Sequence, residues 1–517
     1  MRQRVTFLQE PIDSIDPSKL TVTADSISTP ELLAAREERV TFGLDELPQE
    51  LYRVLKASHV LHIRWVEEGV FETRAPLVAR LSPGLHAFYT PLRNNETSEL
   101  LCPLLKKMFG ALDCISPEKS FTALPRDRFS HSAASQYYSP LPTLLDFTSY
   151  LTHKLCPSRS ATSDFSCISR VQALLSASTL DLDFDTISHV VTLSVFFAPK
   201  TQALSLSKPS SFSPSRMEVG ILSVEKALET EELSLGGFLT VLGESTKPAP
   251  TLFSFPARHH PLPSSQTFVS EFVQPTGLHP TLQLNITSST PPLDDRACSL
   301  HAHLTLPRAI FLDRYQLSDP LFLASKNLSK LHYVTTPVDL EAPAYALTAW
   351  GSSVLLELSP PPQSPSSTSS PTGTEQWTSH IPLHLRYLAP ASNSSGQSQL
   401  EFPYPVLFWA CTAGEGTKFP INPFDRVNLG YDGLFGPRTL FFHLSPSALP
   451  SGDGRLVSRL SVPVLDLDQS SYVEGATAAG VLLGFAWVCW CLVKVWKDTG
   501  YGSGVDMKAA SRDQKMK

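Results

Sequence analysis

The chain has 517 residues, with 42 Lys and Arg against 49 Asp and Glu, so its formal net charge is −7 at pH 7. The basic residues form no block outside the short C-terminal tail, which argues against nucleic acid as a partner. The length is sufficient for two to four domains with their own cores.

The N-terminal residues 1–204 predict an α+β domain. Strands are expected at Arg4–Gln9, Val60–Trp65 and His189–Ala198, where β-branched and aromatic residues concentrate. Helices are expected at Glu31–Arg39 and at Leu47–Lys56, the second of which has apolar residues at helical spacing. The first residues contain no apolar run, so no ordinary cleavable signal peptide is expected.

The middle of the chain changes to a β pattern. Residues 205–216 are rich in Ser and Pro and are expected to be a linker. Residues 217–277 are expected to form an intermediate β segment, and residues 278–472 a sandwich-like β domain with a disordered Ser/Pro loop at 359–373. Its expected strands are Thr281–Thr287, His301–Leu306, Leu331–Thr335, Val354–Leu358, Ile381–Leu388, Val406–Cys411 and Thr439–Leu444.

The stretch Gly475–Val493 contains no charged residue. A helix of about 19 residues spans roughly 28 Å, close to the ~30 Å hydrocarbon core of a bilayer. We therefore predict a transmembrane helix at 473–493 and a tail at 494–517. Because Lys494 and Lys497 follow the helix directly, the positive-inside rule places the tail in the cytosol and the N-terminal bulk in a lumen. A tail-anchored cytosolic protein is the alternative.

One face of this helix carries small residues. Ala476, Gly480 and Gly484 recur at every fourth position, a spacing that lets another helix approach closely. A chance occurrence has equal weight, because small residues are common in membrane helices.

Sequons and cysteines are consistent with an oxidising, luminal compartment. Candidate N-glycosylation triplets begin at Asn95, Asn285, Asn327 and Asn393. The candidate disulfide cysteines outside the expected membrane helix are Cys102, Cys114, Cys156, Cys167, Cys298 and Cys411. Their even number permits disulfides, but the sequence does not choose among the pairings.

Motifs of catalytic and metal sites are absent or incomplete. The sequence has no GxSxG elbow, P-loop or HExxH. His301-Ala302-His303 puts two imidazoles on one strand face, but no third ligand is evident, so a solvated face is preferred. Asp181-Leu182-Asp183 and Asp466-Leu467-Asp468 resemble the acidic pair of metal-dependent glycosyltransferases, yet solvated carboxylates are the preferred interpretation. We expect no catalytic, cofactor-binding or metal-binding residues.

A series of short motifs occupies the membrane-proximal β region. They are Leu306-Pro307-Arg308, Asp313-Arg314-Tyr315, Leu340-Glu341-Ala342-Pro343, the run from Ile381 to Pro390, Phe402-Pro403-Tyr404-Pro405 and Phe408-Trp409-Ala410-Cys411. Their order ahead of one C-terminal span, over residues 278–493, resembles the PIG-X family. The likeness is greatest to its longer fungal branch, the protease-B-nonderepressible (Pbn) proteins.

The resemblance implies a non-catalytic, single-pass type III glycoprotein of the endoplasmic reticulum. Such proteins stabilise the multi-spanning catalytic subunit of GPI mannosyltransferase I, which adds the first mannose in GPI-anchor biosynthesis. The fungal members are also implied to aid folding of other proteins in that compartment. No cofactor, nucleic acid or small-molecule substrate is expected for this chain. A general luminal chaperone without a dedicated enzyme partner is the alternative, and a glycosyltransferase using Asp466 and Asp468 is a third.

The motif with Leu383-His384-Leu385-Arg386-Tyr387 supplies candidate contacts. Alternation predicts that His384 and Arg386 face outward. Leu383, Leu385 and Tyr387 are then expected to face the core. The candidate partner contacts are His384, Arg386, Tyr387, Ala476, Gly480 and Gly484. Ordinary strand alternation without a partner is the other interpretation.

Overall fold

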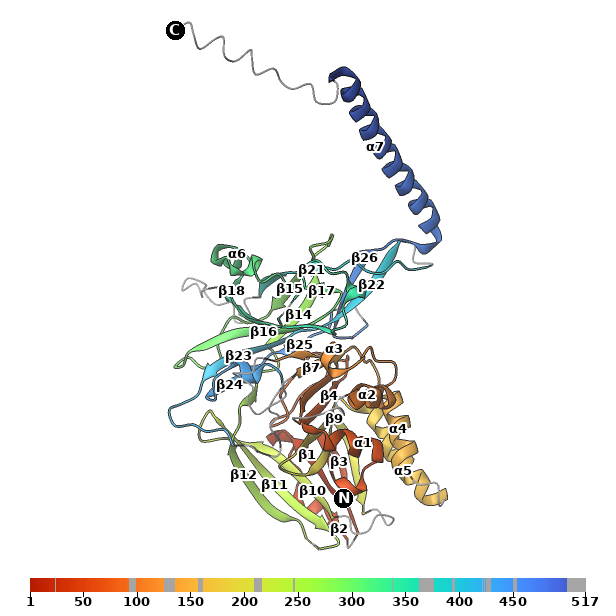
Figure 1. Ribbon diagram of the computed structural model, residues 1–517. Coiled ribbons are helices and arrows are strands. Elements are labelled where there is room, and N and C mark those ends of the chain that lie inside the picture. The colour runs from red at the N-terminus through yellow and green to blue at the C-terminus, as the bar shows by residue number, and fades with distance from the viewer. Residues whose placement is uncertain are drawn as a thin grey trace. The chain divides into compact units, whose positions relative to one another are not determined.

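The computed structural model describes residues 1–499 except 24, 93–98, 125–134, 157–160, 209–215, 245–246, 337, 362–375, 393–395, 421, 423, 425–428 and 450–452 (Figure 1). The protein is mainly β-sheet with few helices and one long apolar C-terminal helix. It divides into two compact units, Met1–Leu388 with Leu400–Leu460, and Ala389–Gln399 with Ser461–Lys517. Most of the expected 359–373 loop and of the C-terminal tail lies outside the described residues.

A twelve-stranded sheet occupies the N-terminal part of the first unit. In spatial order its strands are β12 (Ala249–Pro256), β11 (Glu232–Leu242), β10 (Arg216–Glu225), β1 (Arg2–Gln9), β3 (Ser26–Gly43), β9 (Val190–Ser207), β8 (Thr179–Asp185), β4 (Ser58–Val66), β5 (Gly84–Pro91), β7 (Ser135–Ser139) and β6 (Thr122–Ala123), with β2 (Thr21–Val22) paired to β3. Strands β1 and β10 pair in parallel, so β10–β12 extend the sheet that β1–β9 form. The proposed domain boundaries at 204 and 216 stay predictions.

The segment Glu31–Arg39, expected as a helix, lies inside strand β3, so that prediction is wrong. Its backbone pairs with β1 on one side and β9 on the other. Leu32 and Ala34 are buried while Glu31 and Leu33 are exposed, which is the two-residue period of a strand. Glu, Leu, Ala and Arg favour helices in isolation, but pairing on both edges overrides this weak preference.

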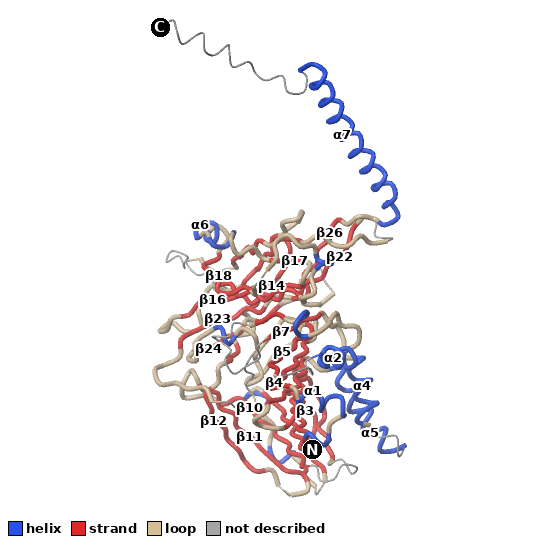
Figure 2. Tube along the Cα trace, in the orientation of Figure 1, coloured by secondary structure: helices blue, strands red, loops and turns tan. Residues whose placement is uncertain are grey.

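Helices pack on the large sheet (Figure 2). They are α1 (Gln49–Lys56), α2 (Leu101–Phe109), α4 (Leu145–Leu155) and α5 (Ala161–Ala173). The short α3 (Pro117–Ser120) follows α2 in the chain. The expected helix at Leu47–Lys56 is confirmed, because α1 buries Leu51, Val54 and Leu55 in one cluster with residues of β4, β5 and β8.

Smaller sheets follow in the chain. The six-stranded sheet runs β13 (His259–Pro261), β24 (Thr439–His443), β23 (Val406–Thr412), β16 (Cys298–Pro307), β19 (Gly351–Leu358) and β18 (Leu328–Val334). A four-stranded sheet runs β20 (Trp377–Pro382), β15 (Thr281–Ile286), β14 (Thr267–Phe272) and β25 (Ser445–Pro446), and β17 (Ile310–Phe311) pairs with β21 (His384–Leu385). Phe272 and Leu282 of the four-stranded sheet line the same small cavity as Leu304 of the six-stranded sheet. These two sheets therefore face each other as in a sandwich.

The second unit carries the long helix α7 (Ser470–Thr499). Within the described part of the chain, Leu467–Asp498 is the one helical stretch long and apolar enough to cross a membrane. It contains the predicted span at 473–493. The strands β22 (Gln397–Pro403) and β26 (Val457–Pro463) pair with each other, and parts of both belong to this unit.

An aromatic core joins the large sheet to the six-stranded sheet. Phe408 of β23 is fully buried, with ring centroids 4.8 Å from Tyr431 and 5.4 Å from Phe441. Phe88 of β5 belongs to the same buried cluster. The Tyr431 hydroxyl donates to the backbone carbonyl of Arg80 at 3.1 Å. The two sheets therefore share one hydrophobic core, as expected of a single compact unit.

Buried histidines accompany these aromatic rings. His259 Nδ1 lies 2.8 Å from His443 Nε2, and the two rings stack. Burial lowers the pKa of His443 to about 3. Burial likewise lowers the pKa of His86 to about 4. These imidazoles are neutral in the folded protein at pH 7, because burial disfavours the charged form, and the positive charges of Arg80 and Arg64 lower the pKa of His443 further.

We predict that acidification from pH 7 to pH 5 destabilises the protein. His443 has a folded pKa of about 3. Its unfolded value is about 6.5, so the unfolded chain binds more protons below that pH and stability is lost as the pH falls. At pH 5 the loss from this residue is about 2 kcal/mol. Thermal unfolding followed by tryptophan fluorescence should show this slope.

A His443→Asn variant keeps a hydrogen-bonding group for His259 and should flatten the slope. His153→Ala, at an exposed position of α4, should leave it unchanged. A pH-independent melting temperature in the unmodified chain would contradict burial of neutral imidazoles.

Candidate partner-binding site

Arg386, expected to face outward, is buried at 6% exposure, so that prediction is wrong. Its Nη1 donates to the carbonyl of Ala342 at 2.8 Å, and its guanidinium lies 4.4 Å from the ring centre of Phe311. Its backbone N–H donates to the carbonyl of Ala309 at 2.9 Å. Strand β21 ends at Leu385, so the alternation that predicted an outward side chain no longer applies one residue later. Burial lowers the pKa of Arg386.

Tyr387, expected in the core, is 70% exposed, and that prediction is wrong for the same reason. Leu383 is buried as expected, and Leu385 is half-buried.

His384 is half-buried rather than fully outward. Its ring stacks on Phe311 at 5.3 Å and its Nε2 lies 3.1 Å from Oε1 of Gln316. Its Nδ1 is 3.0 Å from Nδ1 of His279. Burial, and then the nearby His279, lower the pKa of His384. The His384 ring therefore connects the segments that contain His279 and Gln316 and is not a free charged group on the surface.

The short motifs of this region meet around Arg386. Ala309 directly follows Leu306-Pro307-Arg308, and Ala342 belongs to the Leu340–Pro343 motif, and both carbonyls accept from Arg386. The Asp339 carboxylate accepts from the backbone N–H groups of Glu341 and Ala342, each at 2.9 Å, which fixes that turn. We call this arrangement the Arg386 brace: Arg386, Ala309, Phe311, Asp339 and Ala342. The brace gives the Leu306–Arg308 and Leu340–Pro343 motifs a structural role.

Exposed tyrosines border the brace. Tyr315, Tyr345 and Tyr387 are 63%, 66% and 70% exposed. The backbone N–H of Ala344 donates to the carbonyl of Tyr387 at 2.9 Å, and Tyr345 is the next residue along the chain. Tyr315 precedes Gln316, which contacts His384. We call these three side chains the tyrosine surface. Tyrosine offers a large apolar ring with a polar tip and is enriched at protein interfaces.

Two of these three side chains are not among the contacts that the sequence predicts. Tyr315 lies in the Asp313-Arg314-Tyr315 motif, and Tyr345 follows Leu340-Glu341-Ala342-Pro343 by two residues. The available signal was an aromatic residue two positions after the turn-forming residues Asp313 and Pro343, a position more often exposed than a strand interior.

The small-residue stripe of α7 is open on the isolated chain. Ala476 is exposed, and a Cβ atom added at Gly480 or Gly484 would meet nothing within 4 Å. The helix thus has room for another helix at this face, although no described contact occupies it.

Two sequons fall within the described residues. Asn327 is exposed, has a left-handed φ of 56°, and its Nδ2 donates to the carbonyl of Thr378 at 2.8 Å. Asn285 is half-buried on β15 and its Nδ2 donates to Glu271 Oε1 at 2.9 Å. Asn95 and Asn393 lie outside the described residues.

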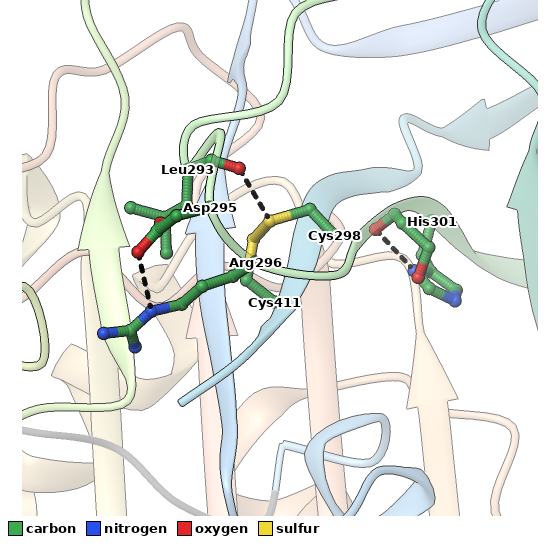
Figure 3. The surroundings of a disulfide bond; sticks show 7 residues. Leu293, Asp295, Arg296, Cys298, His301 and Cys411 are labelled. Carbon is green, nitrogen blue, oxygen red and sulfur yellow. Dashed lines mark hydrogen bonds and ion pairs between the residues drawn. A yellow bond between two sulfur atoms is a disulfide. The ribbon is translucent and has the colours of Figure 1, made fainter. Parts of the chain in front are cut away.

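Six cysteines form disulfides in the structure. Cys298 and Cys411 are direct neighbours on β16 and β23, with Cα atoms 4.1 Å apart (Figure 3). The remaining pairs are Cys102–Cys114 and Cys156–Cys167. The Cys298–Cys411 bond crosslinks the centre of the six-stranded sheet, and the other two fasten helices that cover the large sheet.

The acidic triplets have structural partners. Asp181, expected to be solvated, is 3% exposed and lies 2.9 Å from His62 Nε2 and 3.5 Å from Arg64 Nη1. Burial opposes the charge on His62, but the carboxylates of Asp183 and Asp181 outweigh it and raise the pKa of His62. Asp466 caps a short helix by accepting from the backbone N–H of Asp468 at 3.0 Å. Asp181 thus compensates buried cations, and Asp466 caps the N-terminus of a short helix.

Comparison with known proteins gives consistent matches. Residues 275–493 match the family model described as PIG-X / PBN1. The chain is 49% identical to Protein pbn1 of Neurospora crassa over 97% of each chain. It is 45% identical to Protein pbn1 of Emericella nidulans, covering 99% of this chain and 100% of that one. It is 27% identical to Protein PBN1 of Saccharomyces cerevisiae over 53% of this chain and 57% of that one.

We predict a large loss of stability at one of two adjacent residues and almost none at the other. Arg386→Ala removes the donor to the Ala342 carbonyl and leaves space beside Phe311, so it should lower the free energy of unfolding by about 2–4 kcal/mol. Tyr387→Ala, at an exposed position, should change it by less than about 0.5 kcal/mol. Urea unfolding of the full chain in detergent, followed by tryptophan fluorescence, measures both. Equal losses would contradict the brace.

Proposed function

The chain belongs to the PIG-X / PBN1 family, and we propose that its tyrosine surface and the stripe of α7 hold the catalytic partner of this family in its folded form. The protein is the stabilising subunit of GPI mannosyltransferase I, the enzyme that adds the first mannose to the GPI-anchor precursor. It is a non-catalytic accessory chain of the endoplasmic reticulum.

The mechanism is mass action. A protein that binds only the folded form of its partner lowers the populations of unfolded and degraded forms, in proportion to how far its concentration exceeds the dissociation constant. The observation that carries this proposal is the rigid mounting of exposed Tyr387 on the buried Arg386 brace. A surface held rigid before binding loses little conformational entropy when it binds, so more of the contact energy remains as affinity.

The proposed partner is the multi-spanning catalytic subunit. The tyrosine surface contacts its luminal loops, and Ala476, Gly480 and Gly484 pack against one of its membrane helices. In a bilayer, helix association depends on close backbone approach rather than on the hydrophobic effect, which suits a stripe of small residues.

The orientation we propose has the N-terminal bulk in the lumen and the tail in the cytosol. Lys494 and Lys497 on one side of the span support it through the positive-inside rule. Disulfides such as Cys298–Cys411 persist in an oxidising lumen. The exposed Asn327 sequon is accessible to a glycosyltransferase there.

We predict that Tyr315→Ala, Tyr345→Ala and Tyr387→Ala together reduce co-purification of the catalytic subunit at least about tenfold, because interface tyrosines carry a large share of binding energy. Tyr52→Ala on α1, also an exposed tyrosine, is the matched control. Undiminished recovery with the triple variant, at unchanged stability, would contradict the proposed luminal contact.

The same co-purification assay tests the α7 contact separately from the luminal contact. Gly480→Leu with Gly484→Leu adds bulk to the stripe, whereas Ala478→Leu with Ala486→Leu adds similar bulk to the opposite face. Only the first pair should lower recovery. Equal recovery with both pairs would remove helix docking from the proposal and leave the luminal contact in place.

The orientation predicts a specific topology result. Glycosidase treatment of microsomes should lower the apparent mass of the chain, and added protease should remove only the C-terminal tail. Asn327→Gln should reduce the mass shift by one glycan. A chain with no shift and a protease-accessible bulk would be a tail-anchored cytosolic protein, contrary to the proposal.

A further inference from the structure

Two histidines and a glutamate converge on the six-stranded sheet. His301 on β16, Glu357 on β19 and His332 on β18 place one ligand atom each within 4.8 Å of one another. The three strands are consecutive neighbours in the sheet, and His301 lies directly opposite Glu357 in the register. The cluster is therefore built on paired backbone rather than on loops, which favours a precise geometry.

An irregularity in β18 aims His332 at this cluster. Leu331 pairs with Leu356 and Tyr333 with Leu355, so the register shifts at His332. Such a bulge re-aims a side chain and is frequent at functional sites. It brings His332 Nε2 to 2.6 Å from Glu357 Oε2 and the His332 ring centroid to 5.1 Å from that of His301.

Neighbouring groups orient the cluster. The Nδ1–H of His301 donates to the Ser299 carbonyl at 3.1 Å, which leaves Nε2 as the nitrogen with a free lone pair. The His301 ring is held edge-on to Phe435 at 4.9 Å. The Ser329 hydroxyl donates to Glu357 Oε1 at 3.2 Å. Metal-binding histidines typically donate their second ring N–H to a carbonyl or carboxylate in this way.

The solvated strand face preferred for His301 and His303 is wrong, because both side chains are buried, and His303 does not join the cluster. His303 Nε2 lies 2.7 Å from Ser353 Oγ, inside the aromatic core. The ligands that complete His301 come from two other strands, 31 and 56 positions along the chain from it by residue number.

We propose that His301, His332 and Glu357 bind one Zn²⁺ ion. Two imidazoles and one carboxylate are a recurrent zinc ligand set, with water in the fourth position. Ca²⁺ and Mg²⁺ prefer sites made of oxygen ligands, and Mn²⁺ and Fe²⁺ bind a given nitrogen site more weakly than Zn²⁺. The ion takes the place of the His332–Glu357 hydrogen bond.

The ion clamps β18 to the sheet. This strand is the last in the order of the six-stranded sheet and carries two register shifts, so fewer regular backbone bonds hold it. A metal with ligands on β16, β19 and β18 ties three strands at one point. This role does not depend on the identity of the protein's partner.

The test uses the purified full chain in detergent, stripped with a chelator and dialysed. Isothermal titration with ZnCl₂ at pH 7 should show one equivalent bound. His332→Ala and Glu357→Gln, both at partly exposed positions, should each raise the Kd for Zn²⁺ at least about tenfold. Loss of a group that only hydrogen-bonds to a metal ligand already has an effect of that size. His153→Ala removes an exposed imidazole elsewhere and should change nothing. Zn²⁺ should raise the melting temperature of the unmodified chain and of His153→Ala only.

No Zn²⁺ binding to the unmodified chain, or equal affinity in all variants, would overturn the proposal. Where a variant fails to fold, the visible absorption spectrum of Co²⁺ bound to the unmodified chain tests the site instead. An intense visible spectrum of tetrahedral Co²⁺ with nitrogen and oxygen ligands supports the site. The weak spectrum of octahedral, water-bound Co²⁺ overturns it.

Discussion

Burial of Phe408, Tyr431 and Phe441 against Phe88 is the constraint on which the first unit depends. Each aromatic side chain of this size contributes about 1.5–3 kcal/mol when fully buried. The family model begins at residue 275, yet this core is completed by Phe88 and by β13 at His259–Pro261, which pairs with β24. The N-terminal residues therefore belong to the same compact unit as residues 275–388 and 400–460 of the family-matched region, and those residues alone would expose the core.

Polar groups in this unit are placed where the fold needs them. Asp181 neutralises a buried cluster with His62 and Arg64, and Arg386 donates to the carbonyls of Ala309 and Ala342. A buried charge persists only when it is paired or hydrogen-bonded. The Leu306–Arg308 and Leu340–Pro343 motifs thus contribute to a structural support around Arg386, and the contact of the exposed tyrosines with a partner is our proposal.

Periodicity predicted helix α1 and six of the seven expected strands of the β region, because burial on one face imposes a simple repeat. The expected strand Ile381–Leu388 is wrong, because β20 ends at Pro382 and β21 contains only His384–Leu385. Periodicity also failed at Glu31–Arg39, where pairing with β1 and β9 overrides helix propensity, and at Arg386 and Tyr387, where the strand ends. The convergence of His301, His332 and Glu357 was not predictable, because it depends on which strands are neighbours and on a bulge. Nor was the cysteine pairing, since register places Cys298 against Cys411 across 113 residues.

The central claim is that the chain stabilises its catalytic partner and takes no part in the chemistry. The most direct test is a pulse–chase measurement of the catalytic subunit in cells that carry the tyrosine-surface variant as their only copy of this chain. Unchanged synthesis with a shortened half-life, and activity falling in proportion to the remaining catalytic subunit, is the result we predict. An unchanged half-life with lost mannosyltransferase activity would contradict the claim and assign the chain a role in the reaction itself.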